Sequence, residues 1–163
     1  EMCIRDSTLY NAKSGGMSAS FPRVSPDGRY LLYTLSGYGN FSIWHKDADL
    51  YMTDLQTGTS RSLAEVNSDD VESYHSWSSN SRWFVFSSRR IDGLYTRPYI
   101  AYVGEDGKVG KPFLLPQKDV GFYPSFMKSF NIPEFITGKV KVQGRALAIK
   151  AKEDKGTDVR FAK

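Results

Sequence analysis

The stretch Phe21–Thr34 reads FPRVSPDGRYLLYT, and it recurs without a gap as YHSWSSNSRWFVFS over Tyr74–Ser87, an offset of 53 residues. In each copy an aromatic residue opens a short strand, a polar turn follows, and an almost wholly apolar strand comes next. Ser25–Gly28 predicts a tight turn, because proline fixes φ, aspartate bonds back to the backbone and glycine tolerates positive φ. Ser78–Ser81 fills the same place with less suited residues. The apolar strand after each turn predicts burial on both of its faces.

A second pair of strands completes each copy. The predicted strands are 49–55 and 60–63 in the first copy, and 99–103 and 111–115 in the second. Four short strands in about 50 residues are typical of one β-propeller blade. The sequence therefore predicts an all-β fold of two to three four-stranded antiparallel blades, an incomplete β-propeller, with an irregular basic C-terminal tail.

A third copy is predicted to start and then decay. Tyr123–Phe126 mirrors the opening of both earlier copies, but no Ser-Pro-Asp-Gly turn follows. Residues 139–142 are a candidate strand, 145–155 a candidate short helix, and Thr8–Tyr10 a candidate last strand of a preceding blade. The predicted division is 1–17 as a non-native-looking start and blade remnant, 18–70 and 71–120 as blades, 121–137 as the start of a degenerate blade, and 138–163 as a basic tail.

Composition places the positive charge in that tail. The chain has 163 residues, of which 40% are apolar and 14% aromatic, so a core can be buried. Residues 138–163 hold eight Lys or Arg and three acids, a charge of +5, which leaves −1 for the other 137 residues. A basic tail can bind anionic surfaces, including nucleic acid. We favour the alternative of a solvated terminus, and we expect no nucleic-acid partner.

The start of the chain carries little functional information. Residues 1–7 resemble a non-native string, so they are left out of functional reasoning. Cys3 is the only cysteine, which excludes an intrachain disulfide. No signal peptide is visible, and no run of 18 apolar residues predicts a membrane span.

The repeat resembles that of TolB-type β-propellers over roughly residues 18–135. The residues that carry the resemblance are Ser25–Arg29, Asp49–Asp54 with Thr57 and Gly58, Ser87–Arg90, and Asp92 with Gly93. More narrowly, 77–86 and 92–102 resemble envelope-associated propeller proteins of Bacteroidetes-type bacteria. The resemblance implies a periplasmic or envelope-associated interaction module with no catalytic residues to carry over. Closed propellers need four to eight blades, so we expect a C-terminal fragment whose remaining blades belong to a longer parent chain.

The loop at 36–47 is the first candidate binding site. Its glycines make it shapeable, and loops carry function disproportionately. The candidate contact residues are Tyr38, Phe41, Trp44 and His45. The alternative is that these rings pack over the neighbouring blade.

The loop at 88–97 is the second candidate, because it carries Arg89, Arg90 and Arg97. Three guanidinium groups could bind a carboxylate or a phosphate. The favoured alternative is that Arg89 or Arg90 pairs with Asp92 or with the acidic run at 69–72, since most surface charge is solvated or paired.

Motifs for catalysis, metals and cofactors are missing from the sequence. His45 and His75 lie 30 residues apart with no zinc-ligand spacing around them, and His75 occupies the repeat position of Pro22. No nucleophile elbow, phosphate loop or dinucleotide fingerprint is present. We therefore predict no enzyme activity, metal or cofactor. The favoured function is a protein- or glycan-binding scaffold of the bacterial cell envelope. The alternative is a regulatory propeller fragment of a prolyl-oligopeptidase-like peptidase.

Overall fold

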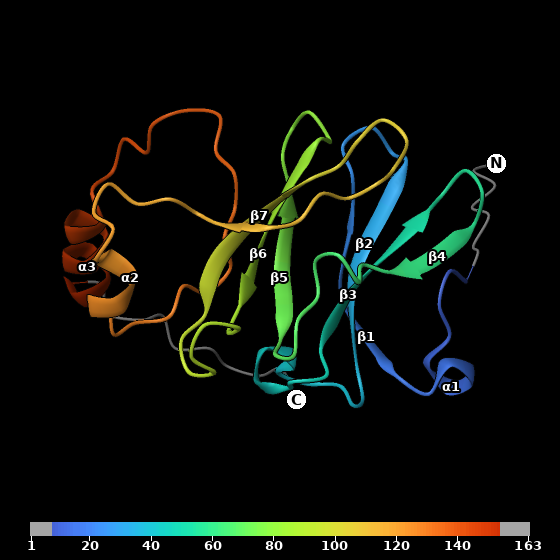
Figure 1. Cartoon of the computed structure of the whole chain (residues 1–163). Coiled ribbons are helices and arrows are strands. Elements are labelled where there is room, and N and C mark those ends of the chain that lie inside the picture. Colours follow the sequence, from blue (N-terminus) through green and yellow to red (C-terminus); the bar gives the residue numbers. More distant parts are fainter. Residues whose placement is uncertain (1–7, 154–163) are drawn as a thin grey trace, which may run out of the picture.

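Two four-stranded antiparallel sheets form the body of the molecule (Figure 1). The computed structural model describes residues 8–153. The first sheet has the order β1 (Ser18–Val24), β2 (Tyr30–Ser36), β3 (Asp49–Asp54) and β4 (Thr59–Ser62). The second has the order β5 (Glu72–Trp77), β6 (Trp83–Ser88), β7 (Arg97–Tyr102) and β8 (Phe113–Leu114). The short helical elements are α1 (Ala12–Gly15), η1 (Ser42–Trp44), α2 (Phe122–Ser125) and α3 (Gly144–Glu153). The prediction of an all-β fold built from incomplete propeller blades is confirmed.

The two copies of the sequence repeat also share details of backbone conformation. Both first strands carry a bulge, between Ser20 and Arg23 in β1 and at the matching place in β5. Within the bulges, Phe21 and Tyr74 both have φ of 53°, the left-handed region that side chains of this size rarely adopt. Their rings meet edge to face, with centroids 4.9 Å apart. The same strained residue in the same place shows that the two sheets are two copies of one unit.

The two polar turns are also equivalent. The Oγ of Ser25 accepts from the Tyr30 N–H at 2.9 Å, and Ser78 makes the matching bond. Gly28 has φ of 74°, and its counterpart Ser81 has φ of 58°. Ser81 is more than a poor replacement for glycine, because its Oγ accepts from the Asp27 N–H at 2.9 Å and so ties the two turns together.

Replacing Gly28 by alanine should lower the free energy of unfolding by about 1 kcal/mol, because an added Cβ is disfavoured at positive φ. No atom lies within 4 Å of that Cβ position, so the cost is conformational and not steric. Urea denaturation measures it. Gly138→Ala is the matched control, since Gly138 also has open space and no positive φ. Equal stability of the two variants would contradict the prediction.

One core cluster joins the two sheets and so holds the blades together. Its buried members are Tyr30, Leu32, Leu50, Met52, Leu63, Val66, Phe84, Phe86, Tyr99, Ala101, Val103 and Val109. A smaller cluster of Leu31, Tyr33 and Leu35 lies on the other face of β2, with Tyr10 and Met17 packed against it. The burial of β2 on both faces agrees with its apolar sequence. No helix within residues 8–153 is both long and apolar enough to cross a membrane.

Three of the minor element predictions are wrong. Tyr123–Phe126, expected to form the opening strand of a third copy of the repeat, overlaps the helical turn α2. Residues 139–142 and Thr8–Tyr10 are not strands either. The third copy lacks the turn that would bring a partner strand alongside, and an unpaired strand leaves its backbone groups unbonded. The helix predicted at 145–155 is confirmed as α3 up to Glu153, and residues 154–163 and 1–7 lie outside the described residues.

The chain reaches the position of a third blade later than the sequence alignment indicates. The Phe130 N–H donates to the Thr96 carbonyl at 3.1 Å, as the Glu72 N–H donates to the Ala48 carbonyl at 2.8 Å one blade earlier. Ala48 and Thr96 each directly precede the third strand of their sheet. The connector into this position is 116–129, six residues longer than its counterpart 64–71. Ile132–Phe135 (IPEF), and not Tyr123–Phe126, is therefore the structural counterpart of Phe21–Val24.

Candidate functional site: a loop surface with an aromatic pocket

The two candidate loops lie at the same end of the two sheets (Figure 1). One loop joins β2 to β3 and contains η1, and the other joins β6 to β7. Together with residues 129–131 of the C-terminal segment they enclose a pocket of about 460 Å³. The pocket is lined by Phe41, Ile43, Trp44, Tyr74, Arg89, Leu94, Thr96, Ser129, Phe130 and Asn131. The structure thus brings both predicted loops to one surface.

The β2–β3 loop has a fixed base and projecting rings. Ser42 Oγ lies 2.9 Å from Ser73 Oγ, which ties η1 to the second sheet, and Ile43 is buried beneath it. Phe41 adopts φ of 48° at the start of η1. The side chains of Phe41 and Trp44 are left 70% and 67% exposed. The alternative, that these rings pack over the neighbouring blade, holds only in part: Trp44 contacts Arg89 in the β6–β7 loop of that blade, but most of the Phe41 and Trp44 surfaces stay exposed.

His45 and Tyr38 belong to the framework of this loop. His45 is buried, and its ring lies against Tyr38 with centroids 3.9 Å apart. Tyr38 remains mostly exposed on its other face. Within residues 8–153, no three His, Cys, Asp or Glu side chains form a group that could hold a metal ion.

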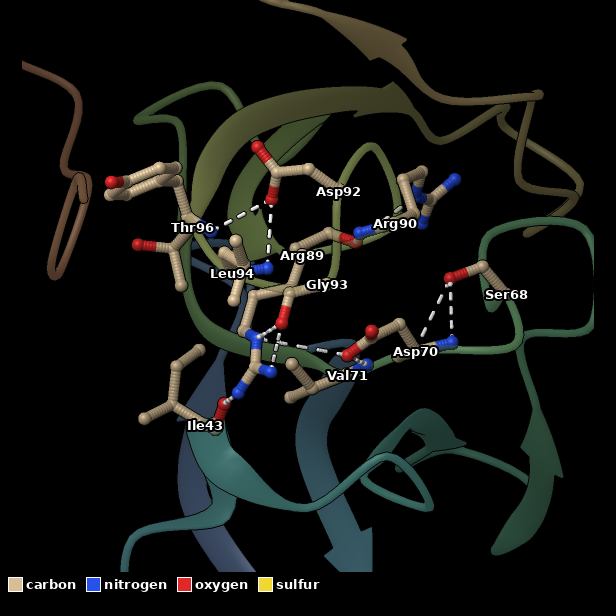
Figure 2. A network of polar contacts seen from close by, with 12 residues as sticks. Ile43, Ser68, Asp70, Val71, Arg89, Arg90, Asp92, Gly93, Leu94 and Thr96 are labelled. Atoms are coloured by element: carbon tan, nitrogen blue, oxygen red, sulfur yellow. Dashed lines mark hydrogen bonds and ion pairs between the residues drawn. The ribbon is translucent and has the colours of Figure 1, made fainter. Parts of the chain in front are cut away.

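Arg89 fastens the two loops to each other (Figure 2). Its Nε donates to the Gly93 carbonyl at 3.0 Å, its Nη2 donates to the same oxygen, and its Nη1 donates to the Ile43 carbonyl at 3.4 Å. Asp70 lies 3.9 Å from Nε and balances the charge. The guanidinium also lies 5.0 Å from the centre of the Trp44 ring, a cation–π contact that fixes the indole. Arg89 therefore holds the two loops that line the pocket in place, and most of its N–H donors are already used.

Arg90 is part of a buried polar network. It donates to Glu72 at 2.9 Å and to the Val66 carbonyl at 2.6 Å. Glu72 is fully buried and also accepts bonds from Ser68 and Ser88. These donors satisfy the hydrogen-bonding capacity of a carboxylate that has no access to water. Arg90 thus links the connector between the sheets to the β6–β7 loop.

Arg97 is the most deeply buried of the three arginines, with 2% of its surface exposed. It donates to the carbonyls of Lys128, Phe126 and Tyr123 at 2.7, 2.9 and 3.2 Å. Asp92 lies 4.0 Å away and supplies the opposite charge. Arg97 therefore clamps the C-terminal segment onto the second sheet. All three arginines have a partner acid, so the sequence-based preference for pairing over anion binding is supported by the contacts.

Two aspartates near the loops have shifted pKa values of opposite sign. Burial, and secondarily the charges of Glu72 and Asp47, raise the pKa of Asp49 to about 6. Burial would also raise the pKa of Asp92, but bonds from the Tyr95 and Leu94 N–H groups, together with Arg97, hold it below its ordinary value. Asp92 is therefore held in its charged form by its partners, whereas Asp49 has two acidic neighbours that raise its pKa.

Sequence reasoning missed one wall of the pocket. Ser129, Phe130 and Asn131 come from the segment that Arg97 holds in place, far along the chain from the two loops. The aromatic at position 74 was visible as a repeat residue, but its bulge was not. The only available signal was the buried arginine itself, whose partners cannot be read from spacing.

Similarity to known proteins is found among solved structures. No protein-family model matches the sequence, and no curated protein matches it. Among solved structures, it is similar to the β-propeller domain of the Trilobed protease from Pyrococcus furiosus, which has an open velcro topology. That alignment has 22% sequence identity and a TM-score of 0.38, and it covers 61% of this chain and 30% of that chain.

Proposed function

We propose that this chain is a non-catalytic, TolB-like β-propeller segment that binds a protein or glycan partner of the bacterial cell envelope. The proposal rests on one observation above all. Phe41 and Trp44 project from a loop whose base is tied down, with about two thirds of each side chain exposed. The envelope location is supported by the resemblance of 77–86 and 92–102 to envelope-associated propellers.

The exposed rings favour binding because the fold of residues 8–153 leaves most of their surface uncovered. Arg89 contacts the Trp44 ring and His45 lies against Tyr38, and the rest of each ring is open. Tyr38, Phe41, Trp44 and Leu94 are each at least 66% exposed and lie on the two adjacent loops. Contiguous exposed apolar side chains mark interaction sites in soluble proteins, and tryptophan is enriched among residues that dominate binding energy. The paired state of Arg89 and Arg97 favours a partner read by shape and apolar contact over one read by charge.

Removing both rings should strongly weaken partner binding without unfolding the protein. Phe41→Ala with Trp44→Ala is expected to weaken retention of the partner by about tenfold or more, since each exposed anchor contributes on the order of 1 kcal/mol or more. The immobilised chain is incubated with a solubilised bacterial envelope fraction, and bound proteins and polysaccharides are quantified. Val120→Ala is the matched control, because Val120 is 99% exposed and does not line the pocket that Phe41 and Trp44 line.

Loss of the same component from the double variant, with retention on the Val120 variant and unchanged melting of all three proteins, supports the proposal. Identical recoveries on wild type and both variants would overturn it.

A further inference from the structure

The pocket has one aromatic wall and one polar wall. The aromatic lining residues are Phe41 and Trp44 of the first loop, Tyr74 of the β5 bulge, and Phe130 of the C-terminal segment. Ser129 and Asn131 supply a hydroxyl and a carboxamide from the C-terminal segment. A volume of about 460 Å³ lies within the range of small-ligand sites. A pocket lined by both aromatic rings and neutral polar groups indicates a ligand with one apolar face and a polar rim.

The aromatic wall is rigid on the side of Trp44. The indole belongs to η1, whose base is bonded to Ser73 through Ser42, and it is fixed by the Arg89 guanidinium 5.0 Å from the ring centre. A ring that is already ordered loses little conformational entropy when a ligand stacks on it. Trp44 is therefore a preformed stacking platform.

The polar wall has unused hydrogen-bonding capacity. Ser129 Oγ accepts from the Thr96 N–H at 3.3 Å, which leaves its own proton free to donate. Within residues 8–153, the Asn131 carboxamide and the Tyr74 hydroxyl make no hydrogen bond, although the Asn131 carbonyl accepts from Ser87. These groups are neutral and combine donors with acceptors, which suits ligand hydroxyl or acetamido groups.

The engaged state of Arg89 disfavours a strongly anionic ligand in this pocket. Arg89 is the one cationic side chain in the lining, and its guanidinium is engaged with Gly93, Ile43 and Asp70. Binding a carboxylate or phosphate here would require breaking those bonds. A neutral ligand requires none of them to break.

We propose that the pocket binds one neutral sugar residue of a glycan, with its C–H face on Trp44 and its hydroxyl or acetamido groups on Ser129 and Asn131. A pyranose presents such an apolar face and a rim of donors and acceptors, and C–H contacts with aromatic faces are weakly attractive. This inference rests on the proposed function and narrows its partner from protein or glycan to glycan.

The test measures binding of neutral disaccharides to the full chain by titration calorimetry. The probes are lactose, maltose and N,N′-diacetylchitobiose, with glucose 6-phosphate as the anionic comparison and a tryptophan-containing peptide as the protein-like comparison. Trp44→Ala and Asn131→Asp are each expected to weaken saccharide binding about tenfold, the loss of roughly one anchoring contact. Asn40→Asp is the control, because Asn40 lies on the same loop and does not line the pocket.

Saturable binding of at least one disaccharide, weakened in both test variants and retained in Asn40→Asp, supports the proposal. It is overturned if no disaccharide binds, if glucose 6-phosphate or the peptide binds in preference, or if both pocket variants bind as wild type. Trp44-dependent retention of an envelope protein without saccharide binding would leave the proposed function standing and remove only the sugar site. Asn131→Asp keeps the test decisive should Trp44→Ala fail to fold.

Discussion

Replacing Arg97 by methionine is expected to lower the free energy of unfolding by about 3 to 5 kcal/mol, the loss typical of breaking a buried charged network. Three carbonyls of the C-terminal segment lose their donor together, and Asp92 loses its partner charge. Methionine keeps most of the length of the side chain, so the change is polar more than steric. Arg97 also lies 5.1 to 5.9 Å from the ring centres of Tyr95, Tyr123 and Phe126, contacts that lose their cation.

Urea denaturation measures the loss, and limited proteolysis shows where it falls. Cleavage should appear first within 116–136, because this segment depends on the Arg97 clamp. Arg82→Met is the matched control: Arg82 pairs with Glu105 at the surface, a kind of ion pair that contributes at most about 1 kcal/mol. Equal losses in the two variants, or cleavage confined to other segments, would show that Arg97 is not the clamp.

The blades were predictable from sequence because each one encodes its fold locally. Turn residues at 25–28 and two-sided apolar strands after them fix where each hairpin bends and which element is buried. The weaker second turn, 78–81, folds in the same way because Ser78 repeats the bond of Ser25 and Ser81 bonds to the neighbouring turn. The local turn bonds and the bond between the two sheets favour the same structure, so the repeat can be recognised from the sequence.

The start of the third copy was predicted at the wrong residues. Tyr123–Phe126 resembles the opening of a blade, but the backbone bond to the preceding sheet that sets the position of a blade is not visible in the sequence. Phe130 makes the bond that Glu72 makes one blade earlier, so the connector is longer and α2 lies within it. Connector length varies freely between repeats, and an alignment by residue type alone cannot detect such a shift.

The candidate site was predictable in part. The sequence placed Phe41 and Trp44 on a glycine-rich loop but left open whether their rings are exposed or packed, whereas the pairing of the arginines follows from the acids at 69–72 and at 92. The polar wall of Ser129 and Asn131 was not predictable, because it depends on where Arg97 holds a distant segment. Single-residue chemistry is visible in sequence, whereas the meeting of two remote segments is a property of the fold.

The buried His75 and the half-buried Asp49 should give the protein opposing responses to acid. Burial lowers the pKa of His75 to about 4 from an ordinary value of 6.5, and its Nε2 lies 3.0 Å from the Leu32 carbonyl, to which it donates. The unfolded chain therefore binds more protons between these values, so this contribution is complete above pH 6.5 and is lost as pH falls toward 4. Asp49, with its pKa raised to about 6, acts in reverse: the folded state binds more protons, and its contribution is lost as pH rises through 6.

Single variants should separate the two responses between pH 4.5 and 7. In Asp49→Asn only the histidine remains, and stability should fall by about 2 to 3 kcal/mol from pH 6.5 to 4.5, at about 1.4 kcal/mol per pH unit. In His75→Gln, whose carboxamide can still donate to the Leu32 carbonyl, stability should rise as pH falls. Asp27 and Asp92 have lowered pKa values, so they titrate below this window.

Urea denaturation of wild type, both single variants and the double variant measures the free energy of unfolding at several pH values. Wild type and the double variant should change little across the window, because the two responses cancel in one and are absent in the other. As the pH falls, the free energy of unfolding should decrease in Asp49→Asn and increase in His75→Gln. Parallel curves for all four proteins would mean that neither group changes its proton affinity on folding, and the contact between His75 and Leu32 would then be a packing contact without a pH-dependent energy.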